Sequence, residues 1–179
     1  MNGYEYAQSN SILKFDDNGQ KTIVIVAYSN FLGVSVGDHT GLYLTQGGNN
    51  GAQALYDPSG YYKASEEGSG GVKNRPPTGF FNIPPWHVSL NDYKSYQTGF
   101  GGSAFIKVIE FNTTKSEEQL IGKKAFELGD LRGLNCAFSI GFVLKNSGVN
   151  LFSELDDDYF FPGSLYDDLD NIKNPSSGW

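Results

Sequence analysis

Thiols and imidazoles are scarce in this chain of 179 residues, which contains one cysteine, Cys136, and two histidines, His39 and His87. A single cysteine excludes a disulfide framework within the chain and a thiolate-rich zinc site. Two histidines leave a dedicated metal site poorly supplied with ligands. We therefore expect no metal site and no cofactor.

Positive charge and long apolar runs are also lacking. The chain has 13 lysines and arginines against 20 aspartates and glutamates, a net charge of −7, and its basic residues form no stripe. This balance argues against a nucleic-acid partner. No uninterrupted apolar stretch approaches the roughly 20 residues of a membrane span, and residues 1–6 lack the basic and apolar regions of a signal peptide. A soluble protein without a membrane span or a visible export signal is predicted.

The chain does contain enough apolar material for a folded core. Hydrophobic residues make up 39% of the sequence and aromatic residues 15%, which is typical of a folded protein rather than a disordered one. A chain of this length corresponds to about one domain. No internal repeat or linker is visible, so we predict a single domain over residues 1–179.

The first half of the sequence has the patterns of two β-hairpins. Residues 11–15 and 22–28 flank Asn18-Gly19, a pair that favours a tight hairpin turn. Residues 22–28 are almost uniformly apolar, which predicts a central strand buried on both faces. After a loop at 29–38, residues 39–45 and 52–57 form the second hairpin, which Pro58 ends. Because the start of one strand lies beside the finish of the other, His39 and Asp57 are predicted neighbours.

Residues 61–103 are predicted to form a long irregular insertion, of the kind that often serves as a lid or binding loop. Two proline pairs in it flank an aromatic cluster, and residues 65–71 are mobile by composition. Four side chains of this region are candidates for substrate contacts: Tyr61, Tyr62, Trp86 and His87. A packing role in the core is the alternative for the aromatic ones, and His87 is the only rival to His39 as a base.

The second half of the sequence is predicted to be mainly helical after one strand at 104–111. Thr114 and Glu117 have the spacing of a capping box and open a helix that ends near Gly129. Its predicted buried face consists of Leu120, Ile121, Ala125 and Leu128. A second helix begins at Cys136 and runs to residue 145 or 146, with a buried stripe of Ala137, Ile140, Gly141 and Leu144.

The tail, residues 150–179, is rich in acidic residues. The ligand order of an EF-hand calcium loop is absent, so we predict a solvated acidic rim that contains a turn at 161–165. The core is expected to span about residues 22–146.

Cys136 is the candidate for chemistry, because a thiol at a helix N-terminus meets the positive end of the helix dipole, which stabilises a thiolate. The alternative is a small buried hydrophobe, as free cysteines usually are. A cysteine nucleophile needs an imidazole base and a polar group that orients the base. His39 and Asp57 supply these two groups, and the backbone N–H of Cys136 is a candidate oxyanion donor.

Three segments resemble the circularly permuted papain-like (NlpC/P60) proteins: Gly37-Asp-His-Thr-Gly-Leu-Tyr-Leu44, Leu55-Tyr-Asp-Pro-Ser-Gly60 and Leu134-Asn-Cys-Ala-Phe-Ser-Ile-Gly-Phe-Val-Leu144. In that group, which includes relatives of lecithin:retinol acyltransferase and bacterial effector toxins, the histidine strand precedes the cysteine helix. The resemblance covers roughly residues 22–146 and has no counterpart for the insertion at 61–103. The third catalytic position is often His, Asn or Gln in NlpC/P60 proteins, so Asp57 departs from the common pattern.

The resemblance implies an α+β fold with a central antiparallel sheet and a C-terminal nucleophile helix. It implies a cysteine amidase or peptidase with Cys136 as nucleophile, His39 as base and Asp57 as orienting group. It also implies a substrate in bacterial cell-wall peptide (peptidoglycan), an antibacterial effector toxin exported by a secretion system to a target-cell periplasm, and an immunity protein as partner. Two alternatives stay open: an acyltransferase or lipid hydrolase that uses the same residues, and a binding module in which Cys136 is inert.

Overall fold

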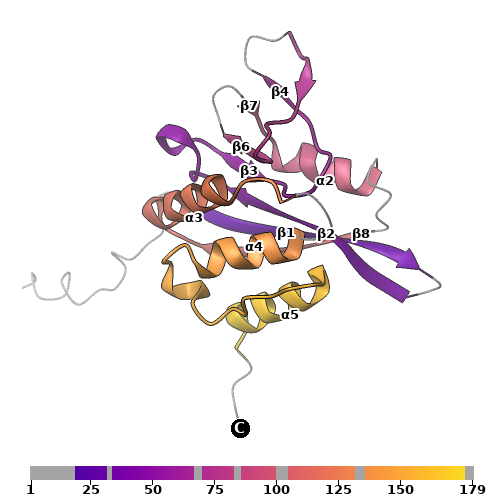
Figure 1. The fold of residues 1–179 in the computed structure, drawn as a ribbon, viewed down its shortest axis with the longest axis vertical. Coiled ribbons are helices and arrows are strands. Elements are labelled where there is room, and N and C mark those ends of the chain that lie inside the picture. Colours follow the sequence, from indigo (N-terminus) through magenta and orange to yellow (C-terminus); the bar gives the residue numbers. More distant parts are fainter. Residues whose placement is uncertain are drawn as a thin grey trace, which may run out of the picture.

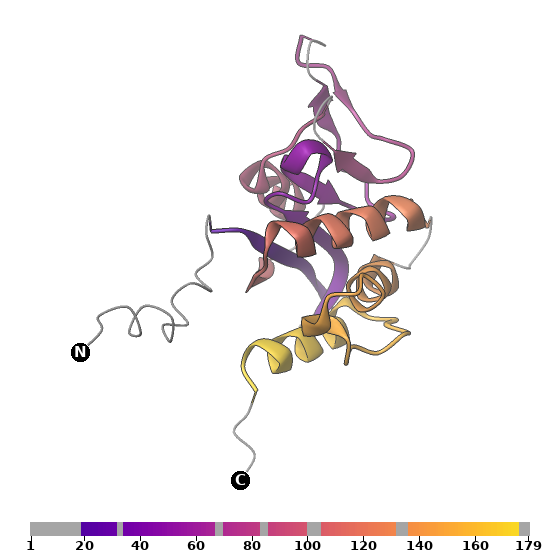
Figure 2. The ribbon, with the colours of Figure 1, turned by 90° about the vertical axis from the view of Figure 1, so that its left-hand side faces the viewer.

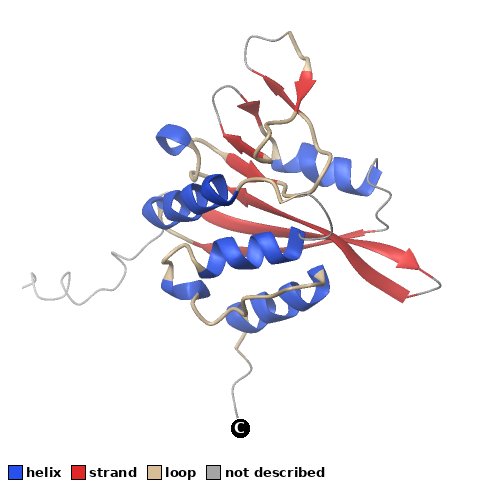
Figure 3. Cartoon of the chain, viewed as in Figure 1, coloured by secondary structure: helices blue, strands red, loops and turns tan. Residues whose placement is uncertain are grey.

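The computed structural model of the chain describes residues 19–31, 34–66, 70–82, 86–99, 105–131 and 136–175. These residues form a mixed α+β fold with an antiparallel five-stranded sheet (Figure 3). The strands of this sheet are β1 (Lys21–Phe31), β2 (Val34–Leu44), β3 (Ala54–Tyr56), β6 (Phe80–Asn82) and β8 (Phe105–Asn112), in the order β6-β3-β2-β1-β8.

A small second sheet and four α-helices complete the described part of the chain. The small sheet has the order β5-β4-β7 and consists of β4 (Ala64–Glu66), β5 (Lys73–Asn74) and β7 (Trp86–His87). The helices are α2 (Leu90–Gly99), α3 (Lys115–Leu128), α4 (Cys136–Lys145) and α5 (Pro162–Lys173). Two short 3-10 turns, η2 (Asn49–Gly51) and η3 (Asn150–Phe152), lie in the connections.

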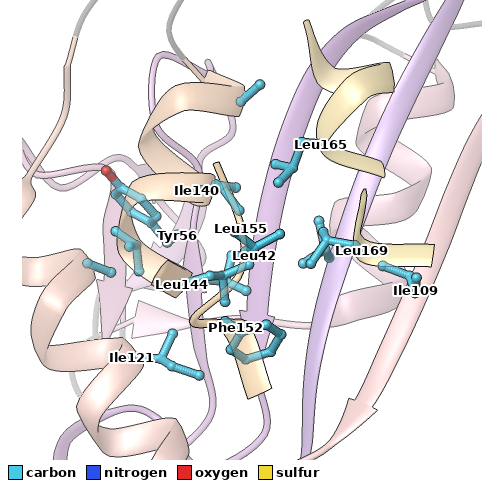
Figure 4. Packing of buried hydrophobic residues seen from close by; sticks show 14 of the residues in the cluster. Leu42, Tyr56, Ile109, Ile121, Ile140, Leu144, Phe152, Leu155, Leu165 and Leu169 are labelled. Atoms are coloured by element: carbon cyan, nitrogen blue, oxygen red, sulfur yellow. The ribbon is translucent and has the colours of Figure 1, made fainter. Parts of the chain in front are cut away.

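The main sheet carries a separate apolar cluster on each face. Helices α3, α4 and α5 lie side by side over one face (Figure 1). The cluster under them contains Val24, Val26 and Leu42 from the sheet with Ile140 and Leu165 from the helices (Figure 4). Neighbouring side chains along a strand point to opposite faces, so every second residue of β1 and β2 enters the other cluster, which contains Ile23, Ile25, Tyr43, Tyr62 and Tyr93. That face is covered by α2 and the small sheet, which lies at one end of the molecule (Figure 2).

Strand β1 is an interior strand of the sheet, between β2 and β8, and its burial on both faces is as the sequence predicts. The first predicted hairpin is wrong in its pairing. Residues 11–15 lie outside the described residues, but both edges of β1 are occupied, by β2 on one side and β8 on the other. Positive φ at Gly19 marks a turn before β1, and the true hairpin partner of β1 is the strand that follows it.

The predicted loop at 29–38 is also wrong for its described residues, because β1 and β2 continue into it. Ser29 pairs with Val36, and a register shift at Ala27 and Tyr28 accommodates an extra residue in the ladder. Such a bulge lets two strands stay paired while they bend. His39 therefore lies in the middle of a long strand, and not at the start of one.

Helices α3 and α4 match their predicted positions. Thr114 and Glu117 form the expected capping box, and Gly129 ends α3 with φ of 70°. The predicted stripe of α4 is buried. Leu120 of α3 is the exception, since it is 46% exposed. It is rotated by about 100° from its neighbour Ile121, which belongs to the buried stripe.

The insertion at 61–103 is more regular than predicted. It contains β4, β5, β6, β7 and α2, and β6 pairs with β3 as an edge strand of the main sheet. Short strands bounded by glycine and proline show only weak hydrophobic periodicity. The sequence pattern of residues 61–103 therefore predicted an irregular loop.

The tail adds apolar residues to the core, while most of its acidic residues, such as Asp157 and Asp158, are exposed as predicted. The predicted turn at 161–165 is the first part of α5, and Leu165 and Leu169 of this helix are completely buried. The four-residue spacing of these leucines places them on one helix face, while acidic residues such as Asp167 stay outside. The interior therefore extends beyond residue 146, and α4 is followed by a further helix that packs on the same face of the sheet.

None of the helices in the described part of the chain is long and apolar enough to cross a membrane. Among the same residues, no group of three or more metal-ligating side chains comes together.

Candidate functional site

His39 and Asp57 are hydrogen-bonded neighbours, as the hairpin pattern predicts. Strand β3 ends at Tyr56, which pairs with Leu42 of β2, and Asp57 is the first residue beyond it. Strand β2 continues past this point, so His39 reaches the turn after β3. The Nε2 atom of His39 lies 2.6 Å from Oδ1 of Asp57.

Asp57 is completely buried and receives several hydrogen bonds besides that of His39. The Tyr93 hydroxyl donates to Oδ1 at 2.7 Å, and Nη1 of Arg75 donates to Oδ2 at 2.7 Å. The backbone N–H of Tyr62 also donates to Oδ2, at 3.3 Å. A buried carboxylate needs such partners, because its desolvation is otherwise very costly. The sequence analysis did not identify Arg75 or Tyr93.

Two glycines make room for this arrangement. A Cβ on Gly41 of β2 would overlap the hydroxyl of Tyr93, and a Cβ on Gly60 would overlap the carboxylate of Asp57. Glycine inside a strand often marks a close approach by another group. Gly41, two residues after His39, is therefore a sequence signal that another side chain, here that of Tyr93, packs over the strand.

The charges of His39 and Asp57 stabilise each other. Burial alone would lower the pKa of His39, but the charge of Asp57 and hydrogen bonds to Asp57 and Cys136 raise it to about 10. Burial would raise the pKa of Asp57, yet the charges of His39 and Arg75 and the hydrogen bonds from His39 and Tyr93 lower it. The pair is consequently an imidazolium and a carboxylate at neutral pH.

Cys136 is the first residue of α4 and is 6% exposed. Its side chain is one of the groups that raise the pKa of His39, and both residues line the same cavity. The first N–H groups of a helix have no partner inside the helix, so backbone donors lie next to the sulfur. Cys136 thus shares a cavity with His39, which is hydrogen-bonded to the buried Asp57.

Hydrogen bonds tie the turn after β3 to the segment that precedes α4. The backbone N–H of Ser59 donates to Oδ1 of Asp130 at 2.7 Å, and the Ser59 hydroxyl donates to the carbonyl of Leu131. Arg75 reaches the same place, with Nη2 at 3.2 Å from Oδ2 of Asp130. The segment that carries Asp57 is therefore held against the segment that leads into Cys136.

A cavity of about 640 Å³ opens over the thiol and the imidazole. This volume is in the range of pockets that take small-molecule ligands. Besides Cys136 and His39, polar side chains of Asp38 and Gln97 line it. The rest of its wall is largely aromatic or small and comprises Val36, Gly37, Ser59, Gly60, Tyr61, Tyr96, Phe160, Phe161 and Pro162.

Comparisons with models of protein families, with curated proteins and with solved structures give no match. A fold does not determine an activity in any case. Function is therefore inferred from the chemistry of the site.

Only one of the four predicted substrate-contact residues lines the cavity. Tyr61 does so and is 82% exposed. Tyr62 is buried in the second apolar cluster, where its ring packs on Tyr93. Trp86 packs against Phe81 with ring centroids 5.7 Å apart and is not part of the cavity wall. His87 is exposed in β7, opposite Ser65, and is not part of the cavity wall.

Sequence reasoning missed four other residues that line the cavity. Tyr96 and Gln97 come from α2, and Phe160 and Phe161 from the segment before α5. These four positions lie in segments predicted to be irregular or solvated. No local pattern connects them to Cys136, because tertiary packing alone brings them to the site.

Proposed function

We propose that the protein is a cysteine hydrolase that cleaves an amide bond through an acyl-thioester on Cys136. The supporting observation is that Cys136 and His39 line one cavity and that His39 is hydrogen-bonded to the buried Asp57. A nucleophile, a base and a group that orients the base are the three parts that such catalysis needs. The raised pKa of His39, about 10, supports an imidazolium in the same cavity as the sulfur.

In the proposed acylation step, the sulfur of Cys136 attacks the carbonyl carbon. Backbone N–H groups at the start of α4 stabilise the negative charge on the carbonyl oxygen. The C–N bond breaks, and His39 gives its proton to the departing amine. Asp57 keeps the imidazole oriented throughout.

In the proposed second step, water hydrolyses the thioester. His39, now neutral, takes a proton from the attacking water. The C–S bond breaks, the carboxylic acid leaves, and the thiolate and imidazolium return. No cofactor enters either step.

The resemblance to permuted papain-like proteins supports more specific proposals about the fold, the substrate and the biological setting. The order of the strand with His39 before the helix with Cys136, on an antiparallel sheet, supports a circularly permuted papain-like fold. The proposed setting is hydrolysis of bacterial cell-wall peptide by an exported antibacterial effector, with an immunity protein as partner. A second candidate function, transfer or hydrolysis of a lipid acyl group by the same residues, draws support from the apolar part of the cavity wall.

The reactivity of Cys136 tests the proposal directly, because no other cysteine competes for the label. An ordinary thiol, with a pKa of about 8.5, is only about 0.3% thiolate at pH 6. We expect iodoacetamide to alkylate the wild type at pH 6 at least about tenfold faster than glutathione, and the His39→Ala variant no faster than glutathione. Intact-mass spectrometry measures both rates.

Turnover is tested by digestion of purified peptidoglycan and identification of the released fragments by mass spectrometry. Removal of the nucleophile in Cys136→Ala should abolish release, and removal of the base in His39→Ala should lower it by about 10²–10⁴-fold. A His87→Ala variant is the matched control and should match the wild type, since His87 is exposed outside the cavity. A wild-type thiol no more reactive than glutathione at pH 6, together with turnover that Cys136→Ala leaves unchanged, would contradict the proposed mechanism. An equally unreactive thiol with no release of fragments by the wild type would leave the binding-module alternative.

A further inference from the structure

Two adjacent phenylalanines stand exposed at the cavity that contains Cys136. Phe160 is 75% exposed and Phe161 is 65% exposed, and both line the same cavity as the thiol. Val36, 41% exposed, and Pro162 adjoin them in the cavity wall. Contiguous exposed apolar surface at a cavity marks a binding surface more often than chance placement does.

The residue before this pair is anchored to the helix of the nucleophile. Tyr159 is buried, and its ring lies so close to α4 that a Cβ on Gly141 would overlap it. Its hydroxyl donates to Oδ2 of Asp168 at 2.7 Å and accepts from the backbone N–H of Asp156 at 3.0 Å. The side chain is therefore fixed at both ends, by packing on the ring and by hydrogen bonds at the hydroxyl.

The residues after the pair are anchored to the strand of the base. A Cβ on Gly37 of β2 would lie 2.9 Å from the backbone N of Gly163 and 3.0 Å from Cβ of Pro162. Gly37 is two residues before His39, and Gly141 is five residues after Cys136. The phenylalanine pair is thus held between contacts to the two elements that carry the reacting groups, so its exposure does not come from a loosely attached loop.

We infer that Phe160 and Phe161 form the wall of a subsite for a bulky apolar side chain of a peptide substrate. The inference rests on the proposed function, since the subsite matters only if Cys136 is acylated. A peptide is favoured over a fatty acyl chain for two reasons. The phenylalanine rings are open to water, so a long chain of methylenes would stay largely hydrated on them, and Asp38 and Gln97 bring polar groups to the same cavity.

The subsite argues against the cell-wall setting proposed above and in favour of another peptide substrate. The small and charged side chains of bacterial cell-wall peptides would leave the phenylalanine wall in water. A peptide with a large aliphatic or aromatic residue on the acyl side of the scissile bond would cover it, and burial of one such side chain is worth about tenfold or more in affinity.

The test uses short peptidyl acyloxymethyl ketones, which alkylate a cysteine nucleophile and carry either phenylalanine or serine at the first or second position on the acyl side. Intact-mass spectrometry gives the rate of labelling of Cys136. We expect the phenylalanine probe to label the wild type about tenfold faster than the serine probe at one of the two positions. The preference should fall below about threefold in the double variant Phe160→Ser, Phe161→Ser.

Phe126→Ser is the matched control, because Phe126 is another exposed phenylalanine, 59% exposed on α3, and lies outside this cavity. It should keep the full preference, and iodoacetamide should alkylate this control at the wild-type rate. Equal labelling by the phenylalanine and serine probes, a preference that survives the double variant, or faster labelling by a dodecanoyl probe would each overturn the subsite. Failure of the proposed function is distinguishable, because the iodoacetamide rate itself would then equal that of glutathione.

Discussion

At the scale of residues, the site is organised around the buried carboxylate of Asp57. Four groups donate to it: the ring of His39, the guanidinium of Arg75, the hydroxyl of Tyr93 and the backbone N–H of Tyr62. A carboxylate with this many donors stays ionised in an apolar surrounding. It therefore fixes both the orientation and the charge of the imidazole beside Cys136.

The charge of His39 leads to a pH-dependent stability. The folded-state pKa of His39, about 10, lies above the ordinary histidine value of about 6.5 expected in an unfolded chain. The folded protein thus holds the proton more tightly, and the resulting stabilisation is complete below pH 6.5 and disappears as the pH rises to about 10. The wild type should melt at a higher temperature than His39→Asn at pH 6, and this difference should shrink as the pH rises to 10. Each kcal/mol of unfolding free energy that is lost should lower the melting temperature by about 2–4 °C.

Differential scanning calorimetry of the two proteins at pH 6, 8 and 10 measures this difference. His87→Asn serves as the control, and its difference from the wild type should not change with pH in this way. An advantage over His39→Asn that stayed constant or grew toward pH 10 would contradict the charged pair.

Residue-level prediction from the sequence succeeded where neighbours are close along the chain. His39 and Asp57 are 18 residues apart and are joined by one hairpin, so turn chemistry alone brings them together. Tyr93 is 36 residues from Asp57, beyond several short strands with little periodicity. No local sequence pattern therefore identifies Arg75 or Tyr93 as hydrogen-bond donors to Asp57. The one indirect signal is Gly41, which leaves space for the ring of Tyr93.

At the scale of elements, α4 is the part that the sequence predicted best, and α5 the part that it predicted worst. The apolar stripe of α4 is uninterrupted, whereas α5 mixes two buried leucines with several acidic residues. Composition pointed to a solvated tail, although the spacing of Leu165 and Leu169 is that of a buried helix face. Burial of Leu165 and Leu169 against the sheet therefore determined the structure of α5 more than the acidic average composition of the segment did.

Contact between α4 and the segment before α5 depends on Gly141. The Gly141→Ala variant should lose about 1–3 kcal/mol of unfolding free energy, because the added methyl group overlaps the ring of Tyr159. The same substitution should weaken the preference for apolar probes, since Tyr159 positions Phe160. Urea unfolding and the labelling assay measure the two effects.

Gly163→Ala is a matched control in α5, where a Cβ would meet no atom within 4 Å. Alanine is the better helix former, so this variant should be neutral or stabilised by up to about 1 kcal/mol. A Gly141→Ala protein as stable as Gly163→Ala would show that Tyr159 does not pack on α4 as described.

At the scale of the whole molecule, Arg75 connects three parts of the chain that are distant in sequence. It follows β5 in the insertion, binds Asp57 beyond β3 and binds Asp130 before α4. Its side chain is only 16% exposed. The insertion therefore belongs structurally to the site, although only one of its four predicted substrate-contact residues, Tyr61, lines the cavity.

Removal of this connection should cost stability as well as activity. Arg75→Ala leaves two acidic groups short of a partner, and loss of one member of a buried ion pair costs about 3–5 kcal/mol. Urea unfolding should show a loss near the lower end of this range, with slower alkylation of Cys136 by iodoacetamide. Lys73→Ala, an exposed cation in β5, is the control and should change neither quantity. Equal unfolding free energies and equal alkylation rates in the two variants would contradict the role assigned to Arg75.

The order of the three proposed catalytic groups along the chain has a consequence for biosynthesis. The base and its carboxylate are translated first and meet within one hairpin, whereas the nucleophile follows 79 residues after Asp57. At about 5–20 residues per second, this interval lasts roughly 4–16 s on the ribosome. β8 and α3 are made in the same interval. A nascent chain therefore holds the imidazole and carboxylate without a thiol to activate, and it gains a nucleophile only when most of the domain is already available to fold around it.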